Sequence, residues 1–72
     1  MQLYNYSKLS GRMRECGYTQ EKLAKAVGIS ATSMNLTLNN KRNFRQDEIL
    51  KVGKILDIPT AELESYFFAQ NL

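Results

Sequence analysis

The segment of residues 17–40, GYTQEKLAKAVGISATSMNLTLNN, restricts the possible folds of this chain more than any other. Thr19 has a side chain that helix N-caps favour, and apolar residues then recur at helical spacing. Gly28 can take a positive φ at little cost, which ends one helix, and Ser30 is a favoured N-cap for the next. Two helices this close together in sequence must cross steeply, so we predict a helix-turn-helix over about residues 19–39.

The flanking sequence predicts further short helices around this unit. Seventy-two residues are enough for one small domain, residues 1–72, with one core. Residues 1–5 are expected to be a loose lead-in, and Gly11 is expected to mark the close approach of a neighbouring helix. We therefore predict an all-α, compact, five-helix domain. The expected helices are 6 or 7 to 16, 19 or 20 to 27, 31–39, 46–56, and a short one from about residue 60.

Apolar residues in this pattern predict the core. Phe44 is expected to close the core beneath a loop, and Phe67 is expected to close it near the end of the chain. Tyr66, Phe68 and Leu72 fit either tail packing or a contact with a second subunit, and both possibilities stay open. Within the helix-turn-helix, helical spacing predicts Leu23, Val27, Met34 and Leu38 as core residues.

The composition excludes several classes of function. Histidine is absent and Cys16 is the single cysteine, so a zinc site or a Ser/His or Cys/His nucleophile is not expected. No apolar run has the length of a membrane helix, and the first residues lack the pattern of a signal peptide. We therefore expect a cytoplasmic binding protein that is not an enzyme, with no cofactor, no metal, no small-molecule substrate and no membrane partner.

Charge is distributed unevenly along the chain. Residues 1–54 contain all ten Lys and Arg and four acids, which gives +6, whereas residues 55–72 contain three acids and no base. Lys41, Arg42 and Arg45 form the densest basic cluster and are expected to stay outside the core. Such a cluster fits contact with phosphates, but it also fits an ordinary solvated surface.

The residues now described carry a resemblance to a known family. GYTQEKLAKAVGIS-(x5)-L-(x)-LNNK, followed by KILDIPTAEL, resembles the Cro/repressor type of helix-turn-helix domain of bacterial and phage regulators. The flanking segments NYSKLSGRMRE, NFRQDEI and ESYFF resemble small Gram-positive phage switch proteins, so the resemblance covers nearly the whole chain. It implies a lambda-repressor-like fold and a role in controlling transcription in a lysis/lysogeny switch.

The resemblance also implies roles for particular residues. Gln20 matches a position that contacts a phosphate, and Asn39, Lys41 and Arg42 match the loop that grips the DNA backbone. The part of the second helix that enters the major groove is matched by Thr32, Ser33, Asn35 and Leu36.

The second helix of the pair departs from this family pattern. If Met34 and Leu38 point inward, Leu36 points almost directly away from the core, because each residue turns the helix by 100°. No Lys, Arg or Gln occurs from Ser30 to Asn40, although these residue types carry much of base recognition. Leu36 stands where relatives have a basic or amide residue, and Asn40 replaces the glycine that follows the helix.

Two functional hypotheses result. In the first, the chain is a Cro-like regulator, possibly a homodimer, that binds double-stranded operator DNA. Thr32, Ser33 and Asn35 then read bases, Leu36 contacts a thymine methyl, and the phosphates are held by Gln20, Lys41, Arg42 and Arg45.

In the second hypothesis, the same outer face binds the cognate phage repressor protein. Leu36 is then an apolar anchor inside a polar rim, and the chain acts as an antirepressor, or modulator of repression. A third interpretation gives Leu36 no role, as one scattered surface leucine.

Overall fold

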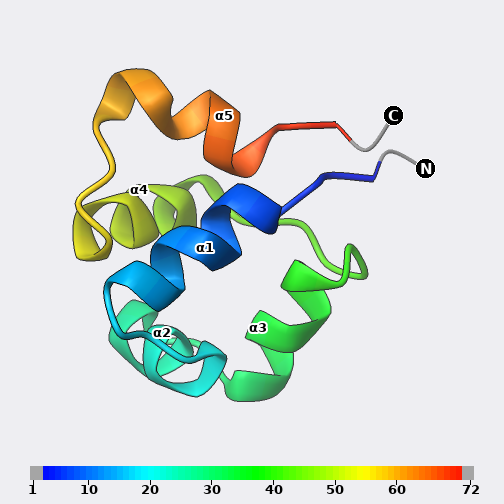
Figure 1. The fold of residues 1–72 in the computed structure, drawn as a ribbon. Helices are drawn as coiled ribbons and strands as arrows, with labels where there is room; N and C mark the ends of the chain where they lie inside the picture. Colours follow the sequence, from blue (N-terminus) through cyan, green and yellow to red (C-terminus); the bar gives the residue numbers. More distant parts are fainter. Residues whose placement is uncertain (1–2, 71–72) are drawn as a thin grey trace.

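Five α-helices and one short 3-10 helix follow one another in residues 3–70, the part of the chain that the computed structural model describes (Figure 1). The first four α-helices begin and end within one residue of the predicted bounds, and the fifth begins at Leu63, after a 3-10 helix that starts at Thr60; the all-α, five-helix prediction is confirmed. The elements are α1 (Ser7–Glu15), α2 (Gln20–Val27), α3 (Ala31–Leu38), α4 (Gln46–Ile55), η1 (Thr60–Glu62) and α5 (Leu63–Phe67).

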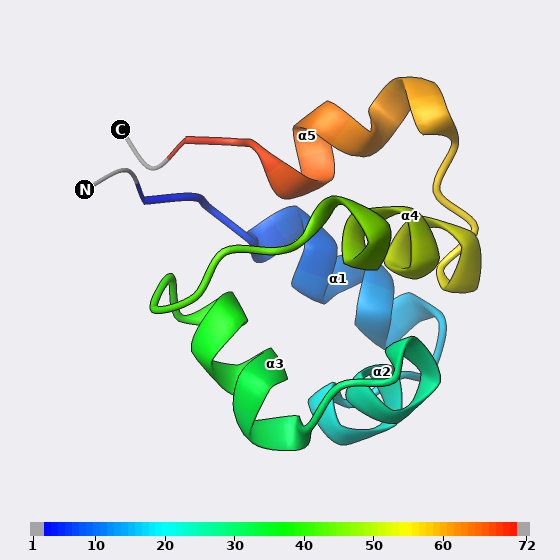
Figure 2. The ribbon, with the colours of Figure 1, turned by 180° about the vertical axis from the view of Figure 1, so that it is seen from behind.

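The helices surround one core. α5 packs against α1 and α4, and α2 packs against α3 and α4. In Figure 1 and in the view from behind in Figure 2, α3 lies at the edge of the molecule, and the loop after it passes close to the N-terminal segment. The two ends of the described chain lie side by side, on the side of the molecule opposite to α2.

Both N-caps predicted for α2 and α3 are present. The Thr19 hydroxyl oxygen accepts a hydrogen bond from the Lys22 N–H at 3.2 Å. The Ser30 hydroxyl oxygen accepts one from the Ser33 N–H at 3.0 Å. These caps satisfy backbone donors that have no partner inside the first turn of a helix. Local sequence therefore determines where α2 and α3 begin.

The first four α-helices end in the same way, with a residue of positive φ just past the helix. At each end, a backbone N–H reaches the carbonyl five residues back, as in a Schellman motif. The bonds are Tyr18 to Met13, Ile29 to Ala24, Lys41 to Leu36 and Ile58 to Gly53. The positive-φ residues are Gly17, Gly28, Asn40 and Asp57.

The core contains side chains from α1, α2, α3, α4 and α5. Phe67 is 1% exposed, and the half-buried Phe44 packs edge-on against it with ring centroids 5.2 Å apart, which confirms both predicted core contacts. Phe68 is 46% exposed, and Leu72 lies outside the described residues. The largest fully buried apolar side chains are Leu9, Leu23, Met34, Val52, Leu56 and Phe67.

Two expectations about the N-terminal part are wrong. A Cβ atom placed on Gly11 would meet no atom within 4 Å, so no neighbouring helix approaches there. Residues 3–5 are not a loose lead-in, because the Asn5 N–H donates to the Ala69 carbonyl at 2.7 Å. Tyr4 also forms an isolated antiparallel bridge with Gln70. The N-terminal segment is thus fixed against the C-terminal one.

No helix within residues 3–70 has the length and apolar character needed to cross a membrane.

Candidate binding surface

The outer face of α3 is defined by which of its residues are buried. Met34 and Thr37 are both fully buried, whereas Leu38 is only partly buried. The expectation that Met34 and Leu38 set the inward direction is therefore wrong in part. With 100° per residue, Leu36 lies about 130° from the mean inward direction rather than about 180°. Leu36 is accordingly 38% exposed, near the edge of the outer face.

The structure brings the predicted α3 residues together on this face. Thr32, Asn35, Leu36 and Asn39 are exposed, and Ser33 is half-buried between them. No charged residue lies in α3 itself. A leucine among hydroxyl and amide groups is therefore what α3 presents to a partner. Whether these residues contact DNA or protein stays a prediction.

Several polar groups of this face already bind one another. The Asn35 side-chain amide donates to the Gln20 side-chain oxygen at 3.2 Å, which joins the start of α2 to the middle of α3. The Asn39 side chain donates to the Asn35 carbonyl at 2.8 Å. The Ser30 hydroxyl donates to the Ser33 hydroxyl at 2.9 Å. Reading a base with Asn35 or Asn39 would require these bonds to break or to be shared.

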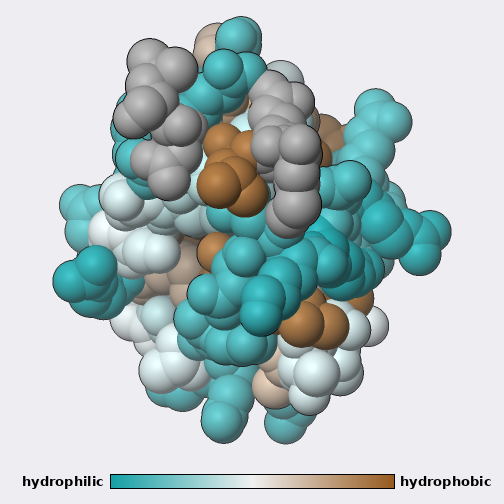
Figure 3. Space-filling model, turned by 90° about the vertical axis from the view of Figure 1, so that its right-hand side faces the viewer, coloured by the Kyte–Doolittle hydropathy of each residue, from teal (hydrophilic) through white to brown (hydrophobic). Residues whose placement is uncertain are grey.

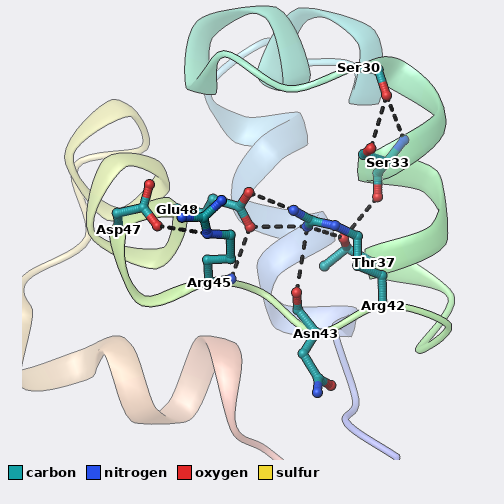
Figure 4. A network of polar contacts seen from close by, with 8 residues as sticks. All are labelled: Ser30, Ser33, Thr37, Arg42, Asn43, Arg45, Asp47 and Glu48. Atoms are coloured by element: carbon teal, nitrogen blue, oxygen red, sulfur yellow. Dashed lines mark hydrogen bonds and ion pairs between the residues drawn. The ribbon is translucent and has the colours of Figure 1, made fainter.

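A partly buried network of hydrogen bonds fixes the loop that follows α3 (Figure 4). The Arg42 guanidinium donates from Nη1 to Glu48 Oε1 at 3.0 Å and from Nη2 to Glu48 Oε2 at 2.8 Å. Nη1 also donates to the Thr37 hydroxyl at 2.9 Å, and that hydroxyl donates to the Ser33 carbonyl at 2.8 Å. The Arg45 N–H donates to Glu48 Oε1 at 2.9 Å, which caps α4. One guanidinium therefore links α3, the loop and α4.

The network also sets the protonation of its acid. Glu48 is buried, with only 4% of its side chain exposed, and burial alone disfavours the charged form of a carboxyl. The hydrogen bonds from Arg42 outweigh this effect and lower the pKa of Glu48 below its ordinary value. The same hydrogen bonds raise the pKa of Arg42. The pair is therefore fully ionised near neutral pH.

The predicted basic cluster is much less available than the sequence suggests. The expectation that Arg42 stays outside is wrong, because its side chain is only 27% exposed and its guanidinium is held by Glu48. Arg45 is exposed as predicted, but its Nε lies 3.4 Å from Asp47. Lys41 is exposed and forms no ion pair within the described chain. Three bases and two acids leave residues 41–48 with a net charge of only +1.

Sequence reasoning missed three residues that build this surface: Thr37, Asn40 and Glu48. Glu48 stands three residues after the N-cap Arg45, which is the position of the acid in a capping box, so a local signal existed. Thr37 gave no such signal. The burial of its hydroxyl depends on the hydrogen bond from Arg42, which forms only in the folded chain. Asn40 was noted as the replacement of a glycine, but its side-chain partner lies 36 residues away in the sequence.

Exposed apolar side chains are few on the described surface. Figure 3, which shows one side of the molecule, has separate small hydrophobic areas set among hydrophilic residues. The exposed large apolar residues within 3–70 are Leu3, Leu36, Leu50 and Phe68. Leu36 is the member of this group that lies on α3.

Five short helices around one core, with an uncharged and exposed α3 face, define a small all-helical domain. The chain belongs to the family described as protein of unknown function (DUF739), whose model matches residues 2–70. It is similar to the solution structure of the modulator of repression (MOR) of the temperate bacteriophage TP901-1 from Lactococcus lactis. The two share 38% sequence identity with a TM-score of 0.77, over 90% of this chain and 88% of that one. No curated protein matches the chain.

These comparisons relate the chain to a phage regulatory protein of the same size and helical fold. They identify the DUF739 family, whereas the resemblance to Cro/repressor domains stays a prediction from the sequence.

Proposed function

We propose that this chain is a modulator of phage repression that acts by binding a repressor protein through the outer face of α3. The observation that carries the proposal is the 38% identity to a phage modulator of repression, which extends over 90% of the chain. Of the two hypotheses raised from the sequence, it favours the antirepressor over the Cro-like regulator.

The chemistry of the α3 face supports a protein partner. Leu36 is 38% exposed, and the residues around it are uncharged hydroxyl and amide side chains. Protein interfaces commonly combine a desolvated anchor with a polar rim, and charged residues are depleted at their centres. Base recognition, by contrast, depends strongly on Arg, Lys, Asn and Gln. In α3 only Asn35 belongs to that set, and its side-chain amide is already bound to Gln20.

The loop after α3 supports the same conclusion. A DNA-binding loop needs cations that are free to meet phosphates. Arg42 is held by Glu48 and Thr37, and Arg45 lies beside Asp47. Moving the Arg42 guanidinium to a phosphate would leave Glu48 buried and unpaired, which is costly. Lys41 alone would provide only a weak interaction with the DNA backbone.

In the proposed mechanism, the chain covers the surface with which the repressor reads its operator. Repressor bound to this chain cannot bind DNA at the same time, so the two partners compete. Binding alone produces the effect, and one copy of the chain bound to one repressor domain is sufficient. The proposal therefore requires neither an enzymatic activity nor a cofactor.

The test measures binding of the purified chain to the cognate phage repressor protein by isothermal titration calorimetry. We expect measurable binding for the native chain, at least tenfold weaker binding for Leu36→Ala, and none for Leu36→Asp. Leu50→Asp is the matched control, because Leu50 is 54% exposed on α4, away from α3. Native-strength binding by Leu36→Asp would overturn the proposed surface.

Direct operator binding is the competing function, and the +6 charge of residues 1–54 favours it. Fluorescence anisotropy on labelled operator DNA at about 50 mM salt separates the two, since phosphate contacts are strongest at low salt. We expect no binding above that of a scrambled duplex. Specific operator binding, together with no binding to the repressor, would replace this proposal with the Cro-like function.

A further inference from the structure

Asn40 does more than end α3. It has a φ of +61°, the conformation for which a glycine is usual, and its carboxamide is turned toward the N-terminal segment. The side-chain oxygen accepts from the Tyr4 N–H at 2.8 Å, and the side-chain nitrogen donates to the Tyr4 carbonyl at 2.9 Å. Both backbone groups of Tyr4 are thus bonded by one side chain, as by a single residue of a neighbouring strand. A glycine at this position would make neither bond.

These two bonds fix the segment of residues 3–5 between two neighbours. Asn40 holds one edge, and the Asn5 N–H bonds to Ala69 on the other edge. The Tyr4 ring packs edge-on against the Phe68 ring at 5.8 Å. In an extended segment successive side chains point to opposite sides, so Leu3 points away from these rings. Leu3 is accordingly 46% exposed.

Leu3 and Leu36 lie within reach of a single partner. Asn40 lies in the turn that ends α3, one helical turn beyond Leu36, where the Lys41 N–H bonds back to the Leu36 carbonyl. The Asn40 side chain touches the Tyr4 backbone, and Leu3 is the next residue, about 3.8 Å away between Cα atoms. A standard interface covers about 800 Å² on each partner, a patch about 30 Å across. By this path through Asn40 and Tyr4, the two leucines are close enough for one patch of that width to cover both.

We propose that Leu3 is a second apolar anchor for the same repressor protein, and that Asn40 is the residue that positions it. The inference rests on the proposed function, because it extends the α3 surface that binds the repressor. It explains the replacement of the usual glycine by Asn40, since only a carboxamide can hold the Tyr4 backbone from that position. The repressor then contacts two leucines, one from each end of a continuous surface.

The first test compares Leu3→Ala with the native chain by titration calorimetry against the same repressor. We expect binding to weaken about fivefold to tenfold, as for a truncated anchor, while the midpoint of thermal unfolding changes by less than about 2 °C. Leu50→Ala is the control and should bind as the native chain does. Native-strength binding by Leu3→Ala, alongside weakened binding by Leu36→Ala, would overturn the role of Leu3 and leave the proposed function intact.

The second test is a double-mutant cycle with Asn40→Gly. This variant keeps the positive φ but loses both bonds to Tyr4, so we expect about threefold to tenfold weaker repressor binding in a chain that is still folded. If Asn40 acts by placing Leu3, its loss should have almost no further effect in a Leu3→Ala background. Additive effects of the two substitutions would overturn the positioning role. Asn40→Asp, which keeps only the acceptor for the Tyr4 N–H, should lie between Asn40→Gly and the native chain.

Other outcomes have distinct meanings. If the native chain does not bind the repressor at all, the proposed function fails, and this inference fails with it. If sedimentation shows a dimer that Leu3→Asp dissociates, a second copy of the chain covers Leu3, and the inference is overturned.

Discussion

Arg42 and Glu48 face each other across two parallel hydrogen bonds, Nη1 to Oε1 at 3.0 Å and Nη2 to Oε2 at 2.8 Å. The pair joins the loop after α3 to the first turn of α4, and Thr37 of α3 accepts a third bond from the same guanidinium. A bidentate pair of this kind fixes the relative orientation of the two side chains as well as the distance between them. The angle at which α3 presents its outer face therefore depends on an arginine that the sequence alone suggests for DNA contact.

Removing Arg42 should destabilise the domain. Arg42→Ala leaves the Glu48 carboxylate buried without its partner, and breaking a buried pair costs about 3–5 kcal/mol. Since the Arg42 side chain is 27% exposed, we expect a smaller loss of about 2–3 kcal/mol. Urea unfolding followed by circular dichroism measures the change. Arg45→Ala is the matched control, because its ion pair is exposed, and it should cost about 0.5 kcal/mol or less. Equal losses for the two variants would contradict the structural role of Arg42.

The same pair predicts how stability depends on pH. The pKa of Glu48 is lowered in the folded chain, so its contribution to stability is fully present above the ordinary glutamate pKa of about 4.3. It is lost as the pH falls through the lower pKa of the folded state. The free energy of unfolding of the native chain should therefore decrease from about pH 5 downward. Glu48→Gln should be less stable at pH 7 and should show a shallower decrease, because it removes this one carboxyl. Parallel pH profiles for the two proteins would show that Glu48 does not contribute.

Two glycines allow a paired test of the backbone. Gly28 ends α2 with a φ of +93°, so Gly28→Ala places a side chain in a strained conformation and should cost about 1–2 kcal/mol. Gly11 lies inside α1, and an added Cβ there meets no atom within 4 Å. Gly11→Ala should therefore stabilise the chain by about 0.5–1 kcal/mol through helix propensity. Thermal unfolding of both variants measures the shifts, which should have opposite signs. A destabilising Gly11→Ala would mean that a neighbour does approach α1.

The helices of this chain could be predicted because their ends are determined locally. Thr19 and Ser30 cap the helices that follow them, and Gly28 has no Cβ to oppose a positive φ. The rotation of α3 could not be predicted in the same way. Periodicity favours Met34 and Leu38 as the inward pair, yet Thr37 is fully buried. Its hydroxyl tolerates burial only because Ser33 and Arg42 satisfy it, and the position of Arg42 depends on tertiary structure.

The candidate surface, too, could be predicted only in part from the sequence. The spacing along α3 is sufficient to place Leu36 on the outer side, because every residue involved belongs to one helix. The availability of Arg42 was not predictable, since a sequence does not say whether a guanidinium meets solvent or a buried carboxylate. The hydrogen bonds between Asn40 and Tyr4 were not predictable either, because the two residues are 36 positions apart in the sequence and meet only in the folded chain.

The acids of α4 should limit whatever affinity the chain has for nucleic acid. Asp47→Asn removes the partner of Arg45 and raises the net charge of residues 41–48 from +1 to +2. We expect stronger binding to a mixed-sequence duplex at about 50 mM salt and a salt dependence steeper by up to about 0.9, the value for one added phosphate contact. Asp57→Asn is the matched control, because it changes the net charge equally at the far end of α4, where Asn also tolerates the positive φ. Fluorescence anisotropy over a salt series measures both variants.

If Asp57→Asn strengthens DNA binding as much as Asp47→Asn, overall charge rather than the loop after α3 governs the interaction. If Asp47→Asn strengthens DNA binding while leaving repressor binding unchanged, Asp47 acts against DNA and not on the α3 face itself.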